Sequence, residues 1–315
     1  MNAPLNMRTQ VESYLAYRRQ AGYALKIEGE QLLRFARFAE QAGYQGPPTL
    51  ELAVRWATAS RGRRTLTAAR RIEVLRGFCR YCQQFDPAIE IPPLGLFGRA
   101  HRRLTPHIYT DMEICALLAA TVHLHPPSGL RGACCEAIFG LIASTGLRVS
   151  EATGLTRTDV DLHRGLLHIR GAKFGKSRLV PLHQTTTRAL KQYARRRDGD
   201  PTATPLEAFF VGDYGRPVRT DSAEYAFRLL RQRLQWTSRG DHPAPRIHDL
   251  RHTFICRTLQ RWYEEGVDID RNILALSTYV GHAKITDTYW YVTATPELMA
   301  IAARRFESCG NGIPS

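Results

Sequence analysis

The chain has 315 residues, and its 44 Lys and Arg against 29 Asp and Glu give a formal net charge of +15 at neutral pH. Such an excess of positive charge favours a polyanionic partner, either a nucleic acid or an acidic membrane surface. No stretch reaches the roughly 18 apolar residues needed to span a bilayer, and the first six residues lack the basic start and apolar run of a signal peptide. We therefore expect a cytosolic protein with a nucleic-acid partner and no membrane contact.

The cysteines raise the question of a metal or redox site. There are seven, an odd number, and Cys79-Arg-Tyr-Cys82 forms a CxxC pair. No second pair stands at zinc spacing, and the two thiols continue an apolar series that recurs at helical intervals: Leu66, Ala69, Ile72, Leu75, Phe78 and Cys82. We predict reduced cysteines in a helical core, with no metal and no cofactor.

The N-terminal third is predicted to be helical, and length alone suggests two domains. Apolar residues follow a helical period from about Val11 to Phe85. Pro92-Pro93 then opens a stretch rich in helix breakers that ends in the basic run 99–103. We predict a helical DNA-binding domain over 1–92, a basic linker over 93–106 and a second domain over 107–315.

Arginines cluster in the first domain and in the linker. For any one of them a solvated helix face is the simpler interpretation, but together they are typical of a phosphate-binding surface. The predicted DNA contacts are Arg63, Arg64, Arg70, Arg71, Arg102 and Arg103.

The second domain is predicted to combine helices with a small hairpin. Helical periodicity covers 112–120, 132–144 and 187–197, whereas the residues between Leu166 and Leu182 alternate as two strands around a glycine-bearing turn. The predicted fold class is therefore mainly α with a small antiparallel β-sheet (α+β).

Arginines and histidines of the second domain offer donors for an anion. Arg148 is expected just inside a short helix that ends near Gly154, where it could instead pair with Glu151. His248 and Arg251 lie three apart near a helix N-terminus, so they share a face that favours an anion. Any one of these residues alone has an ordinary structural explanation.

A histidine and two tyrosines complete the set. Gly281 is predicted to cap a helix, with His282 just beyond it and Tyr289 and Tyr291 following. The planar guanidinium of an arginine binds two oxygens of a phosphodiester at once. A tyrosine hydroxyl can attack the phosphorus of that phosphodiester without a metal. The residues alone do not choose between the two tyrosines.

Five motifs occur in an order that resembles the tyrosine recombinase (phage integrase) family, including its Xer-type enzymes. They are Thr-Gly-Leu-Arg148-Val-Ser-Glu, Leu-Val-Pro-Leu182, His248-Asp-Leu-Arg251-His-Thr-Phe, Val-Gly-His282 and Tyr291. The resemblance implies a catalytic tyrosine recombinase domain preceded by a helical, SAM-like core-binding domain.

The resemblance also implies roles for individual residues. Arg148 and Arg251 match the arginines that clamp the scissile phosphate. His248 matches the histidine that assists proton transfer from the nucleophile, and His282 the one that contacts the phosphate. The family tyrosine follows that histidine by nine residues, which points to Tyr291.

The family's general acid is a lysine in the turn of the hairpin. Counting back from Leu182 points to Lys173, with Lys176 as the alternative. The family often has Gly-Lys-Gly there, whereas this chain has Ala172-Lys-Phe. That departure favours an enzyme of a mobile element, acting in transposition or DNA integration, over chromosome-dimer resolution.

The implied function is site-specific DNA recombination through a covalent 3′-phosphotyrosine, without metal or ATP. Implied partners are double-stranded DNA with paired recombination sites and three further copies in a homotetramer, with or without partner recombinases, in the bacterial cytoplasm at the nucleoid. A last helix that begins at 295–297 would dock on a neighbouring protomer. Two alternatives stay open: DNA relaxation as by a type IB topoisomerase, and a non-catalytic DNA-binding accessory protein.

Overall fold

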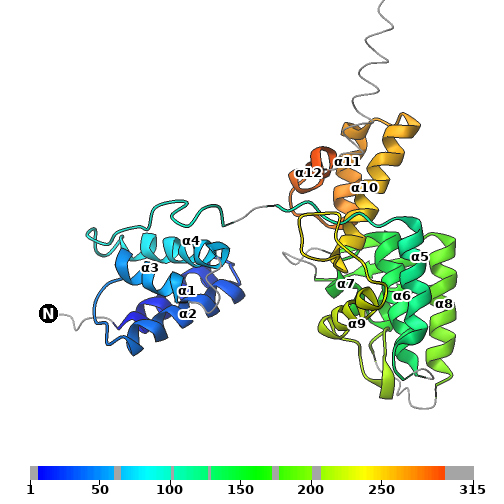
Figure 1. The fold of residues 1–315 in the computed structure, drawn as a ribbon, viewed down its shortest axis with the longest axis horizontal. Coiled ribbons are helices and arrows are strands. Elements are labelled where there is room, and N and C mark those ends of the chain that lie inside the picture. The colour runs from blue at the N-terminus through cyan, green and yellow to red at the C-terminus, as the bar shows by residue number, and fades with distance from the viewer. Residues whose placement is uncertain are drawn as a thin grey trace, which may run out of the picture. The chain divides into compact units, whose positions relative to one another are not determined.

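The computed structural model describes residues 6–59, 65–100, 103–126, 129–171, 177–200 and 207–294. It divides into two compact units, Met1–Arg103 and Leu104–Ser315, each with its own hydrophobic core (Figure 1). The described parts are mostly helical and contain one three-stranded antiparallel sheet, which confirms the predicted fold class. Within them, no helix combines the length and the apolar character that crossing a bilayer requires.

The first unit contains four described helices that share one apolar core. They are α1 (Met7–Gln20), α2 (Lys26–Gln41), α3 (Leu50–Thr58) and α4 (Thr65–Cys82). Phe35 packs edge-on against both Trp56 and Phe78 at its centre. Cys79 and Cys82 lie in this core as predicted, and burial raises the pKa of each thiol to about 12. Leu66, in the first turn of α4, is exposed instead.

The stretch after α4 stays attached to the first unit as far as Ala100. Arg76 donates a hydrogen bond to the carbonyl of Pro92, and Arg70 Nε donates to the carbonyl of Ala100 at 3.3 Å. Ala100 itself is buried. The two units divide at Arg103 and Leu104, within the segment predicted as a linker.

The second unit is built around α6, which packs against α5, α8 and α10 (Figure 1). Its α-helices are α5 (Asp111–Ala120), α6 (Leu130–Thr145), α7 (Val149–Thr153), α8 (Gln184–Asp198), α9 (Thr220–Arg233), α10 (His248–Glu265), α11 (Ile269–Val280) and α12 (Thr286–Ala294). Short 3-10 helices are η1 (Thr121–His123), η2 (Arg157–Asp159) and η4 (Asp213–Gly215). Helices α10, α11 and α12 contact one another and carry the C-terminal motifs.

The sheet follows chain order, with β1 (Val160–Asp161), β2 (Leu166–Ile169) and β3 (Arg178–Pro181) antiparallel. Leu167 on β2 faces Val180 on β3, and both are fully buried, so one face of the hairpin closes the core. The predicted hairpin is confirmed. Its turn, with Lys173 and Lys176, lies outside the described residues.

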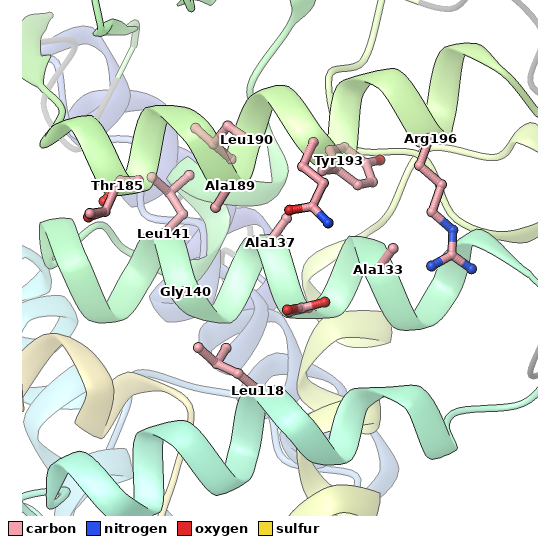
Figure 2. A pocket seen from close by; sticks show the side chains of 13 residues that line it. Leu118, Ala133, Ala137, Gly140, Leu141, Thr185, Ala189, Leu190, Tyr193 and Arg196 are labelled. Atoms are coloured by element: carbon pink, nitrogen blue, oxygen red, sulfur yellow. The ribbon is translucent and has the colours of Figure 1, made fainter.

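A groove of about 280 Å³ lies between α5, α6 and α8. Figure 2 shows the side chains of Leu118, Leu141 and Leu190 from these three helices around it, with Arg196 toward one end. None of the residues predicted for phosphate chemistry is among the described residues that line it. The candidate site therefore has to be sought elsewhere in the second unit.

Candidate active site

Arg148 stands at the turn between α6 and α7. Gly146 ends α6 in the left-handed region, with φ of 65°, and a Cβ there would meet the Phe254 ring at 2.6 Å, so only glycine fits. Arg148 precedes α7 as its N-cap residue and is not inside the helix, so this helix, predicted to begin directly after Gly146, begins at Val149 instead. Its Nη2 donates to the carbonyl of Gly281 at 2.7 Å.

Glu151 joins two arginines. Its carboxylate accepts from Arg148 Nη1 at 2.8 Å and from Arg178 Nη1 and Nη2 at 3.1 and 2.8 Å. Burial alone would raise the pKa of this carboxyl, but the hydrogen bonds and charges of Arg178 and Arg148 lower it to about 2. The carboxylate therefore stays ionised and fixes the direction of the Arg148 guanidinium.

Arg178 ties the start of β3 to the end of α11. Its Nε donates to the carbonyl of Tyr279 at 2.8 Å and its Nη2 to that of Val280 at 3.3 Å. Gly281, with φ of 72°, caps α11 as predicted, and a Cβ there would lie 2.6 Å from Arg178 Nη1. No local pattern singles out Arg178, which directly precedes the Leu-Val-Pro-Leu motif.

Arg251 is a buried, charged residue with one hydrogen-bond donor that is not used in the described structure. Only 2% of its surface is exposed, and its Nη1 donates to the carbonyl of Gly146 at 2.7 Å. Its Nη2 is buried and has no hydrogen-bond partner in the described structure. Burial, and then the charge of Arg148, lowers its pKa to about 10. An anion that accepts from Nη2 would offset both the cost of the buried charge and the cost of the unsatisfied donor.

His248 is the first residue of α10, as predicted, and precedes Arg251 by almost one turn. Burial and the neighbouring charges of Arg251 and Arg246 lower its pKa to about 4. The ring is therefore neutral at pH 7. It can donate one proton and accept another.

His282 and Tyr291 are stacked. The two rings are nearly parallel, at 11°, with centroids 6.1 Å apart. His282 Nδ1 is 2.7 Å from the hydroxyl of buried Thr288, which fixes the orientation of the imidazole. Tyr291 is 3% exposed and packs in an apolar cluster formed by α10, α11 and α12.

Tyr289, the competing tyrosine, points elsewhere. Its ring is 38% exposed, and its hydroxyl donates to Asp270 on α11 at 2.9 Å. That hydrogen bond raises the pKa of the phenol. Of the two tyrosines, Tyr291 is therefore the one that the fold brings to His282.

His252 also belongs to the site, although its sequence position suggested no role. Its Nδ1 lies 2.6 Å from the Tyr291 hydroxyl. Burial, and then the neighbouring His248, lowers its pKa well below the usual value, so the ring is neutral. The available signal was its spacing of four from His248, which puts both rings on one face of α10.

The other predicted residues fall into two groups. Lys173, Arg63, Arg64 and Arg102 lie outside the described residues. Arg71 Nη1 donates to the carbonyl of Trp56 at 2.8 Å, with its guanidinium 4.9 Å from the Trp56 ring, while Arg70 and Arg103 are exposed. Where the chain is described, no three His, Cys, Asp or Glu residues gather as metal ligands would.

Residues 110–297 match the model of the phage integrase family, which is more than half of the chain. The chain belongs to this family. A putative integrase/recombinase of Sinorhizobium fredii, y4rB, is 37% identical over 304 residues, covering 95% of this chain and 96% of the relative. Tyrosine recombinase XerC of Chlamydia trachomatis is 29% identical, covering 74% of this chain and 68% of that protein. The predicted family and its enzyme class, tyrosine recombinase, are confirmed.

Solved structures of tyrosine recombinases share the fold. The Tn1549 transposon integrase, in complex with transposon right end DNA, matches with a TM-score of 0.66 and 18% identity, over 95% of this chain and 99% of that one. The XerH site-specific recombinase bound to palindromic difH substrate matches with a TM-score of 0.65 and 16% identity, over 98% and 91%. At such identities the likeness concerns the fold.

Proposed function

We propose that this tyrosine recombinase is a site-specific DNA recombinase that cuts and rejoins strands through a covalent 3′-phosphotyrosine on Tyr291. The observation that carries the proposal is that hydrogen bonds and ring stacking join motifs that are distant in the sequence around that tyrosine. Arg148 bonds to Gly281, Arg251 bonds to Gly146, and His282 stacks on Tyr291. Residues that are far apart in the chain thus form a single group.

The arginine pair suits the scissile phosphate. A phosphodiester carries one negative charge and gains more as the nucleophile adds, so donors aimed at its non-bridging oxygens stabilise the transition state. Arg251 offers a buried N–H without a partner among the described residues, and Arg148 lies close enough to lower its pKa. His282, beside the phenol, would donate to the same phosphate.

Transesterification then needs only proton transfers. The Tyr291 oxygen bonds to phosphorus, the bond from phosphorus to the 5′-oxygen breaks, and Lys173, or Lys176, protonates that oxygen. The 5′-hydroxyl of a partner strand reverses these steps and releases the tyrosine. One phosphodiester bond is exchanged for another, so neither ATP nor a metal is required.

The DNA surface would extend over both units. Arg63, Arg64, Arg70, Arg71, Arg102 and Arg103 are the proposed phosphate contacts, in line with the net charge of +15. The solved relative from Tn1549 is a complex with transposon DNA, which supports DNA integration or transposition by a mobile element. We extend the proposal to a homotetramer on two paired sites, acting at the bacterial nucleoid.

A suicide substrate tests the nucleophile. On nicked DNA, the short fragment that carries the new 5′-hydroxyl dissociates after cleavage and cannot rejoin. Wild-type enzyme is therefore expected to accumulate a covalent adduct. Tyr291→Phe should bind the same DNA and form none, while the matched control Tyr289→Phe should form it normally. An adduct in Tyr291→Phe would refute the assignment.

The same assay separates the alternative functions. If the chain were a non-catalytic accessory protein, the wild-type protein would form no adduct. A type IB topoisomerase would give the adduct and relax supercoils but would not exchange strands between two sites. Recombinant products from paired sites are the outcome that the proposal requires.

A further inference from the structure

We propose that His252 is the direct proton acceptor of the nucleophile, taking the hydroxyl proton of Tyr291 as that oxygen attacks phosphorus. This inference rests on the proposed function of Tyr291. Its foundation is a short contact between two helices: His252 Nδ1 on α10 lies 2.6 Å from Tyr291 Oη on α12. A general base must stand within hydrogen-bond reach of the proton it removes, and this pair does so before any substrate arrives.

Packing fixes the imidazole in this position. The His252 ring lies edge-on to His248, with centroids 4.8 Å apart, and is tilted against the Tyr291 ring at 5.4 Å. Trp290 packs on it at 6.4 Å. His252 thus stands between His248 and the phenol. His248, which matches the family histidine that assists this proton transfer, would then act through its contact with His252.

The positive charges around His252 make its strength as a base depend on whether the substrate phosphate is bound. The groups that act on His252 are His248 and Arg251 on α10 and His242 and Arg246 before it. In the absence of DNA, burial lowers the pKa of His252 most, and these groups lower it further. A phosphodiester between Arg148 and Arg251 would offset the positive charges and raise that pKa. His252 would then become an effective base only when the scissile phosphate is in place.

The proton balance closes over the full cycle. During cleavage the proton moves from Tyr291 Oη to His252 Nδ1 while the leaving 5′-oxygen receives one from Lys173. During rejoining the attacking 5′-hydroxyl gives its proton back to the lysine. His252 returns its proton to Tyr291 as the phosphotyrosyl bond breaks, so the enzyme ends as it began.

Two substitutions separate proton transfer from shape. His252→Asn keeps a polar group near the position of Nδ1 but cannot take up a proton, and His252→Phe keeps a ring of similar size. For both we expect unchanged DNA affinity by fluorescence anisotropy and adduct formation slowed on the order of 10²-fold at pH 7. The rate of His252→Asn should recover as the pH rises toward 9, because the phenol then ionises increasingly without help.

Modified reactants identify which proton is affected. A substrate with sulfur in place of the bridging 5′-oxygen has a leaving group that needs no acid, so it should rescue Lys173→Ala and leave His252→Asn slow. A difluorotyrosine at position 291 has a more acidic phenol and should rescue His252→Asn. Rescue of His252→Asn by the sulfur substrate would overturn the proposal.

Other results would also decide the matter. Adduct formation by His252→Asn at the wild-type rate would mean that the contact is only a hydrogen bond. Faster cleavage by His252→Phe would mean that His252 restrains the tyrosine. Either result would overturn the inference while leaving Tyr291 as nucleophile, whereas the absence of any wild-type adduct would reject the proposed function itself.

Discussion

Arginines in both units donate to main-chain carbonyls, but they differ in how deeply the whole side chain is buried. In the first unit, Arg70 is exposed and Arg71 half-buried; they bond to Ala100 and Trp56, and Arg71 Nε has no partner in the described structure. In the second unit, Arg251 is almost fully buried and keeps one N–H group without a partner in the described structure. The first pair is at least partly open to water, whereas the whole Arg251 side chain is withdrawn from water at the place proposed for the phosphate.

The physical difference lies in the cost of burial. An exposed guanidinium is hydrated and binds a carbonyl with little net gain, so its presence indicates no particular ligand. A buried guanidinium with an unused donor loses free energy until an anion completes its hydrogen bonds. Near-complete burial of a guanidinium with an unsatisfied donor is therefore a better marker of a phosphate site than positive charge alone.

The largest expected effect is on cleavage by Arg148→Ala. Loss of one donor to the developing charge should slow adduct formation on the order of 10²-fold, or about 3 kcal/mol of transition-state stabilisation. Glu151 keeps its bonds to Arg178, so the fold should persist. Single-turnover cleavage measures the effect, with Arg157→Ala as control because Arg157 pairs with Asp198. Near-normal cleavage would break the contrast between the two kinds of arginine.

Glu151→Gln should lower stability, because Arg148 and Arg178 would lose their shared carboxylate. With a pKa shifted from 4.5 to about 2, the carboxylate contributes about 3 kcal/mol at pH 7. Its folded-state pKa is depressed, so this stability is present above pH 4.5 and is lost as the pH falls toward 2. Denaturant unfolding should show a large gap between wild type and variant at pH 7 and almost none near pH 2. An equal gap at both pH values would contradict the pairing.

The smallest effect is expected from Arg70→Ala. If the exposed guanidinium also contacts DNA phosphate, the slope of log affinity against log salt should fall by about one, with little change in cleavage of bound DNA. Arg34→Ala is the matched control, since Arg34 is an exposed arginine of the same unit paired with Glu30. An unchanged slope would assign Arg70 to fastening Ala100 alone.

Short-range patterns and the order of the motifs pointed to several residues that the fold brings together. Arg148, His248, Arg251 and His282 stand in motifs where helix starts, caps and spacing can be read locally, and helical periodicity gave the fold class. The helix beside Arg148 was predicted to begin too early, because its N-cap depends on the hydrogen bond from the Arg148 backbone N–H to the Glu151 carboxylate.

Long-range contacts could not be read in this way. His252 meets Tyr291 across 39 positions, and Arg148 meets the Gly281 carbonyl across 133. Such contacts depend on how α10, α11 and α12 pack, which no local pattern specifies. For the same reason the residues alone could not separate Tyr291 from Tyr289, whereas their different partners in the fold do.

Mapping the covalent adduct tests the central claim most directly. Wild-type enzyme trapped on suicide DNA would be digested with nuclease and protease, and the peptide that retains a 3′-nucleotide would be sequenced by mass spectrometry. The expected peptide carries the nucleotide on Tyr291. A nucleotide on Tyr289 or on any other residue, or no modified peptide at all, would contradict the assignment of Tyr291 as the nucleophile.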